Sequence, residues 1–177
     1  MANSRKNNTA QASKQETVTP SVIEKQEKIT AKDIDQNQYV VVRNGFQGTL
    51  VYTARTGETY IWDSFGSEQE IELRELKNAK SSHKKMFENN WFMFDEPWII
   101  DYLGVGQYYR NAISIDNFDD MFKKSPDDLK DLIAGMSDGQ KKSVAYRARQ
   151  LINDGTIDSR KTITALEEAL NTELIEK

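Results

Sequence analysis

The residues of this sequence that could do acid–base chemistry are a single histidine and three adjacent pairs of carboxylates. His83 could act as a general base, yet it lies between Ser82 and Lys84 in a polar stretch. The chain has no cysteine and no second histidine to share a metal ion with it. We therefore interpret His83 as a solvated surface residue.

Adjacent acids that flank a scissile bond or a cation are typical of glycosidases and metal sites. In this sequence each pair lies at the predicted start of a helix, where negative charge interacts favourably with free backbone N–H groups. We interpret all three as helix-start residues: Asp95 and Glu96, Asp119 and Asp120, and Asp127 and Asp128. The sequence also has no glycine-rich phosphate loop. We expect a non-enzymatic protein with no cofactor and no metal ion.

Basic side chains gather in one predicted helix, which has no acidic residue between Asp138 and Asp154. At about 100° per residue, Lys142 and Arg149 lie on one flank of its apolar stripe and Arg147 on the other. Long side chains that cover the rim of a buried face produce such a split, and phosphate contact is the alternative. The candidate nucleic-acid contacts are Lys141, Lys142, Arg147 and Arg149.

The segment from Phe87 to Tyr109 is the most aromatic part of the chain. Aromatic rings can stack on nucleic-acid bases, but the acids of this segment would repel phosphates. We interpret the rings as an internal packing seam or a protein interface, with these candidates: Trp91, Phe92, Phe94, Trp98 and Tyr102.

These residues must be positioned by a scaffold that we divide into four parts. Residues 1–38 are rich in Asn, Gln, Lys, Ser and Thr, and we expect a flexible N-terminal arm. The remainder is predicted as a small β module ending in a short helix (39–80), an aromatic-rich connector with a short helix (81–114) and a helical subdomain ending in a helix hairpin (115–177).

The β module predicts an α+β fold, with a small antiparallel sheet or SH3-like barrel followed by the helical subdomain. Short β-prone runs at 49–54, 59–63 and 69–73 follow a first strand around Val40 and Val42, and a helix follows at 74–80. Gly57 is expected to take a positive φ in the turn from Arg55 to Glu58. An edge strand of such a sheet could accept a strand from a partner.

Capping residues set the helices that we expect in the C-terminal half. Asp95 is the predicted N-cap of a helix that stops at Gly104, and Asp116 that of a helix to Lys123. Further helices are predicted from Pro126, after Ser125, to Ile133, then from Ser137 to Asn153, and from Thr162 to Ile175.

The bulk composition restricts the partners. A net charge of −4 provides no general attraction to nucleic acid or anionic membranes. No run approaches the ~18 apolar residues of a membrane span, and no secretory signal is recognisable, so we expect synthesis in a cytoplasm.

Three segments carry a resemblance to a known group: GTLVYTARTGETYIWDSFGSEQEIELRELKNAK, FENNWFMFDEPWIIDYLGVGQYY and SDGQKKSVAYRARQLINDGTIDS. In these the chain resembles uncharacterised virion or virion-associated proteins from phages of Gram-positive bacteria. The resemblance implies a structural protein, made in the host cytoplasm and associated with the head, neck or tail of the virion. Its partners would be other virion proteins or copies of itself, bound through the N-terminal arm and the turn from Arg55 to Glu58. The alternative is a nucleic-acid-binding or transcription-modulating phage protein that uses the basic helix around 141–149.

Overall fold

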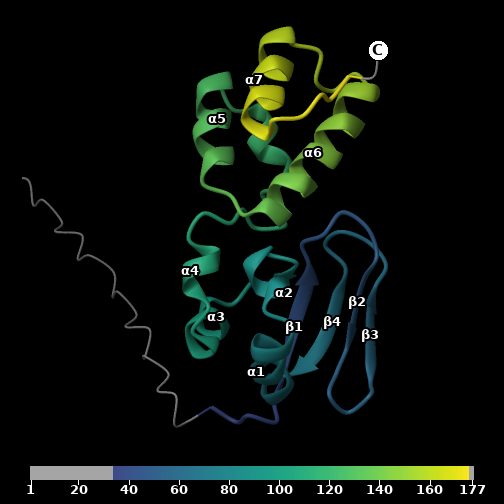
Figure 1. Cartoon of the computed structure of the whole chain (residues 1–177), viewed down its shortest axis with the longest axis vertical. Helices are drawn as coiled ribbons and strands as arrows, with labels where there is room; N and C mark the ends of the chain where they lie inside the picture. Colours follow the sequence, from purple (N-terminus) through teal and green to yellow (C-terminus); the bar gives the residue numbers. More distant parts are fainter. Residues whose placement is uncertain (1–33, 176–177) are drawn as a thin grey trace, which may run out of the picture.

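The computed structural model describes residues 34–175, which form a β-rich module and a helical module (Figure 1). The β-rich module contains, in chain order, β1 (Tyr39–Asn44), β2 (Leu50–Thr53), β3 (Thr59–Trp62), β4 (Glu68–Glu72), α1 (Leu73–Ser82), α2 (Lys85–Glu88), β5 (Phe92–Met93), α3 (Pro97–Leu103) and α4 (Gly106–Tyr109). The helical module contains a 3₁₀ helix (Asp119–Lys123), α5 (Pro126–Ala134), α6 (Asp138–Asn153) and α7 (Arg160–Leu170). The predicted α+β class is confirmed.

The strands form two small antiparallel sheets. In one sheet β1 lies between β4 and β5, and in the other β2 pairs with β3. Val40 and Val42 of β1 are buried, whereas Tyr39 and Val41 face outward. This period of two buries one face of the strand and leaves the other to solvent. Because the strands form two separate open sheets, the sheet alternative of the prediction describes the module better than a closed barrel.

The β2–β3 hairpin has the turn that the sequence predicts. The Gly57 N–H donates to Ala54 O at 2.9 Å, the Ala54 N–H donates to Glu58 O at 2.7 Å, and Gly57 has φ +91°. Only glycine adopts that backbone region without strain. Tyr60 and Trp62 point inward, and Ile61 between them is exposed.

Phe92 of β5 is at the centre of the first hydrophobic core. Its ring lies 5.4 to 5.5 Å, between centroids, from the rings of Tyr52, Trp62 and Phe87. The Trp62 Nε1–H donates to Val42 O at 2.8 Å, so the buried indole keeps a hydrogen-bond partner. Helices α1 to α4 cover this core together with the sheets.

The second core lies among α5, α6 and α7 and is separate from the first. Each of these helices starts at a serine whose Oγ accepts a backbone hydrogen bond: Ser125 from Asp128 N–H, Ser137 from Gln140 N–H and Ser159 from Thr162 N–H. The starts predicted for α5 and α6 are thereby confirmed.

Other helix limits differ from the prediction. Asp95 does not cap α3, because the N-cap is Glu96 and makes no side-chain cap bond. Asp116 does not cap the 3₁₀ helix, which follows Phe118. The last helix runs from Arg160 to Leu170 instead of 162–175, because Ser159 caps its start and the residue after it, Asn171, takes φ +49°.

The predicted N-terminal arm is described only at its end, in residues 34–38. Residues 1–33 lie outside the described part of the chain. Residues 34–38 contact the β-rich module, since the Leu73 N–H donates to Gln38 O and the Arg74 N–H to Gln36 O, both at 2.9 Å. The polar stretch around His83 is short, because α1 extends to Ser82 and α2 begins at Lys85.

The start of α6 joins the two modules. The Ser143 hydroxyl donates to Gly45 O at 2.9 Å. The Gln140 side chain bonds both the N–H and the C=O of Ile113, in the segment that connects the two modules, at 3.3 and 3.0 Å. The Cβ of any other residue at position 139 would lie 2.3 Å from Asn89 O, which is too close for a side chain. Glycine is therefore required where α6 approaches the β-rich module.

Candidate functional site

The groove where the two modules meet is the candidate binding site. Its walls are α6 from Lys141 to Gln150, the loops after β1 and β3, the segment leading into the 3₁₀ helix and the end of α7. It consists of two adjoining clefts, of about 540 and 370 Å³, that share Gln47 and Tyr146 as lining residues. We call the two clefts together the junction groove.

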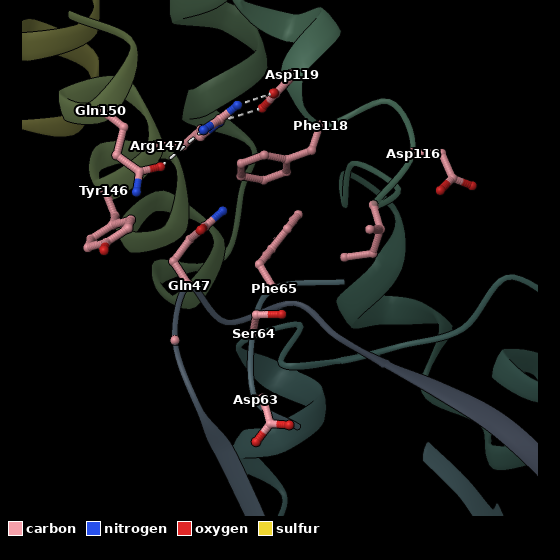
Figure 2. Close-up of a pocket in the computed structure, with 12 residues that line it drawn as sticks. Gln47, Asp63, Ser64, Phe65, Asp116, Phe118, Asp119, Tyr146, Arg147 and Gln150 are labelled. Atoms are coloured by element: carbon pink, nitrogen blue, oxygen red, sulfur yellow. Dashed lines mark hydrogen bonds and ion pairs between the residues drawn. The ribbon is translucent and has the colours of Figure 1, made fainter. Parts of the chain in front are cut away.

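Three aspartates, Asp63, Asp116 and Asp119, line the larger cleft, which we call the aspartate cleft. Figure 2 shows Phe65 and Phe118 in its centre, and their ring centroids are 4.7 Å apart. Asp63 lies at the end of the cleft away from Asp119 (Figure 2). The cleft therefore has an aromatic floor and an acidic margin.

Arg147 neutralises part of that margin. Its Nε and Nη2 donate to the two carboxylate oxygens of Asp119 at 2.9 and 2.5 Å, and Nη1 donates to Gln150 Oε1 at 3.1 Å (Figure 2). The hydrogen bonds that Arg147 donates to Asp119 raise the pKa of Arg147, against the effect of burial. Such a bidentate pair fixes the guanidinium in one orientation.

Arg43 neutralises Asp116 from the other side. Its Nη1 lies 2.9 Å from Asp116 Oδ1 and 3.2 Å from Asp95 Oδ1, and its Nε lies 3.5 Å from Glu68 Oε1. Burial lowers the pKa of Arg43, but the hydrogen bonds with Asp116 and Asp95 outweigh it and the pKa is raised. Sequence reasoning missed this residue, although a lone cation in the otherwise uncharged strand YVVVRN was a usable signal.

Lysines characterise the second cleft, which we call the lysine cleft. Lys141, Lys142 and Arg149 line it together with Phe46 and Leu170. Arg149 Nη2 donates to Glu173 O at 3.0 Å and to Thr172 Oγ1 at 3.3 Å. Among residues 34–175, Lys141 and Lys142 have no ion-pair partner.

The predicted division of the basic helix is thus observed. Lys142 and Arg149 line one cleft, and Arg147 lines the other. Two of the four candidate nucleic-acid contacts, Arg147 and Arg149, are already engaged within the chain. The available positive charge of the groove is therefore that of the two lysines.

Tyr146 separates the two clefts. It projects from α6 with 50 % of its surface exposed, beside Gln47 of the loop after β1 (Figure 2). The half-exposed tyrosine offers apolar area and a hydroxyl group. The unpaired lysines on one side of it and the acidic margin on the other add charges of both signs. Tyrosine is enriched at protein interfaces, and polar and charged groups form their rim.

The candidate seam residues lie in or against the first core, and Trp91 also packs edge-on against Phe46, which lines the lysine cleft. Phe92 and Phe94 are buried, with 0 % and 8 % of their surface exposed. Trp91, Trp98 and Tyr102 are partly buried at the edge of that core, and the Trp98 Nε1–H donates to the Glu96 carboxylate. The rings thus pack the β-rich module internally.

Glu75 of α1 is the one buried acid within the described residues. It accepts hydrogen bonds from the Tyr52 hydroxyl at 2.5 Å, the Arg55 N–H at 3.1 Å and Asn78 Nδ2 at 3.1 Å. Burial raises the pKa of Glu75, but these hydrogen bonds outweigh it and the pKa is lowered. Burial and the same contact raise the pKa of Tyr52. The proton therefore stays on Tyr52, and the pair connects α1 to the hairpin.

His83 and the paired acids have ordinary structural partners. His83 is exposed, contacts Ser82 Oγ through Nδ1 at 2.9 Å and meets the Tyr52 ring edge-on. Asp127 and Asp128 lie in the first turn of α5, as predicted. Within residues 34–175 no cluster of three or more His, Asp or Glu side chains is suited to a metal ion.

No helix in the part of the chain that the structure describes has the length and apolarity to cross a membrane. Comparison with family models, with curated proteins and with solved structures finds no match to this chain.

Proposed function

We propose that this chain is a non-enzymatic structural protein of a phage virion, in the head, neck or tail, and that it binds other virion proteins through the junction groove. The observation that carries the binding role is Tyr146, half exposed between the two clefts. The resemblance of the sequence to virion-associated phage proteins supports the location.

The charges of the groove favour a polypeptide partner. Lys141 and Lys142 are unpaired on one side of Tyr146, and on the other side the Asp63 carboxylate has no ion-pair partner among residues 34–175. A polypeptide that carries an acidic and a basic residue around an apolar side chain complements this arrangement. Opposed charges of this kind determine orientation and exclude wrong partners.

The experiment has two steps. Purified virions are analysed by mass spectrometry, and the phage is then rebuilt with Tyr146→Ala in this chain. Loss of a central interface tyrosine weakens binding by about tenfold or more, so we expect the altered chain to be depleted from particles. Tyr39→Ala is the matched control, because Tyr39 is an exposed tyrosine on β1 outside the groove. Virions that contain no copy of the chain would refute the proposal.

A nucleic-acid-binding role is the alternative, and Lys141 and Lys142 are the observation in its favour. Two phosphate contacts would change the logarithm of affinity by about 1.8 per tenfold change in salt, at about 0.9 per contact. Titration of DNA and RNA against the chain and against Lys141→Ala with Lys142→Ala measures that slope. A flat titration at low salt would eliminate this role.

A further inference from the structure

The outer edge of β2 is a strand edge without a partner among the described residues. The sheet that contains β2 has two strands, and β3 is the one neighbour of β2. In antiparallel pairing, residues alternate between those that bond the neighbouring strand and those whose N–H and C=O point away. The edge therefore presents a defined set of free backbone groups.

The hairpin turn determines which residues those are. Ala54 bonds Glu58 across the turn, so Tyr52 bonds Tyr60, and Thr53 and Val51 point their backbone groups outward. No backbone hydrogen bond joins Val51 or Thr53 to any other segment of the described chain. Two N–H and two C=O groups are thus available to a further strand.

This edge lacks two of the features that keep edge strands apart, because Leu50–Thr53 contains no charged residue and no proline. The cross-strand pair Val51 and Ile61 is exposed on the outer face, with 49 % and 48 % of the surface accessible. An uncharged edge beside exposed aliphatic side chains suits the addition of another strand.

We propose that the strand added to β2 is β2 of a second copy of this chain, antiparallel about a two-fold axis at Tyr52. Val51 then bonds Thr53 of the second copy, and Thr53 bonds Val51 of the second copy. The pairing is self-complementary, because each copy supplies the same two residues in reverse order. A second copy as partner rests on the proposed function, in which the chain binds copies of itself as well as other virion proteins.

Charge complementarity supports the second copy as the occupant. In this register Arg55 of one copy lies opposite Thr49 of the other, and Thr49 is next to Asp63 across the β2–β3 pair. Arg55 and Asp63 are then two strand spacings apart, about 9.6 Å, which their extended side chains span. Both residues are exposed, and neither has an ion-pair partner within residues 34–175. The two-fold axis creates this pair twice.

The test measures the mass of the full chain in solution by sedimentation over a range of concentrations. We expect a dimer for the unaltered chain and for Val51→Thr, which keeps the N–H. Val51→Pro removes an outward N–H without breaking a bond to β3, so we expect its mass to fall by half. Circular dichroism in the aromatic region checks that Val51→Pro keeps the folded core.

A charge exchange keeps the test decisive if Val51→Pro does not fold. Arg55→Asp should weaken the dimer at least tenfold, and Arg55→Asp combined with Asp63→Arg should restore it. A monomer at all concentrations, or a dimer unaffected by every one of these changes, would overturn the proposal. A monomer that is nevertheless present in virions would overturn the β2 pairing alone and leave the virion role intact.

Discussion

At the scale of single residues, Glu75 shows how a buried acid can be structural. Its carboxylate accepts three hydrogen bonds, from the Tyr52 hydroxyl, the Arg55 N–H and Asn78. These bonds stabilise the ionised form more than burial destabilises it, and the pKa is lowered from its ordinary value of 4.5. The ionised form therefore contributes stability to the folded state above pH 4.5.

Glu75→Gln should reduce the dependence of the free energy of unfolding on pH in the acidic range. Because the folded pKa of Glu75 is lowered, its contribution is complete above pH 4.5 and is lost as the pH falls through the folded pKa. We expect the free energy of unfolding to fall as the pH is lowered from about 5 to about 3. This fall should be steeper in the unaltered chain than in Glu75→Gln. Urea unfolding at several pH values measures this, and equal slopes would contradict it.

Aspartates that we assigned to helix starts show what residue-level reasoning misses. Asp95 and Asp116 bind Arg43, and Asp119 binds Arg147. The partners are 52, 73 and 28 residues away in the sequence. A local sequence pattern indicates only interactions between neighbouring residues, such as helix capping. Ion pairs between residues so far apart in the sequence depend on the fold.

At the scale of elements, the serine caps of the helical module were predictable because a cap is a local interaction. Ser125 and Ser137 each precede a helix whose apolar residues recur at helical spacing, and each Oγ accepts a backbone bond. Short elements were not predictable, because α2, α4 and β5 have too few residues to show a period.

Ser137→Ala should destabilise the helical module by about 1 kcal/mol, because the Gln140 N–H loses its acceptor at 3.1 Å. The measurement is the free energy of unfolding from urea titration followed by far-ultraviolet circular dichroism. Ser81→Ala is the control, since Ser81 is an exposed serine near the end of α1. A loss of equal size in both variants would contradict the capping role.

At the scale of the whole molecule, two separate cores are held together by the start of α6 (Figure 1). The contact uses buried polar atoms and one glycine, from Gly139, Gln140 and Ser143. The junction groove exists because this contact fixes the orientation of α6 against the loops after β1 and β3. Binding at the groove is therefore expected to depend on the docking of the modules.

Gly139→Ala should weaken that docking. The added Cβ would lie 2.3 Å from Asn89 O, and overpacking of this kind costs about 1–3 kcal/mol. We expect thermal unfolding to separate into two transitions, one for each core, in calorimetry. Gly106→Ala is the matched control, because its Cβ would meet nothing closer than 3.9 Å. A single unchanged transition in Gly139→Ala would contradict this role.

By itself the sequence determined the α+β class, the hairpin with Gly57, the caps of α5 and α6 and the two flanks of the basic helix. Each of these depends on residues within a few positions of one another, and on the periods of strands and helices. The tertiary structure alone decided the Arg43 and Arg147 ion pairs, the hydrogen bonds of Glu75 and the junction groove. Apart from the local bond from Asn78 to Glu75, the partners in these ion pairs and hydrogen bonds are 20 or more positions apart, and only tertiary packing brings such residues into contact.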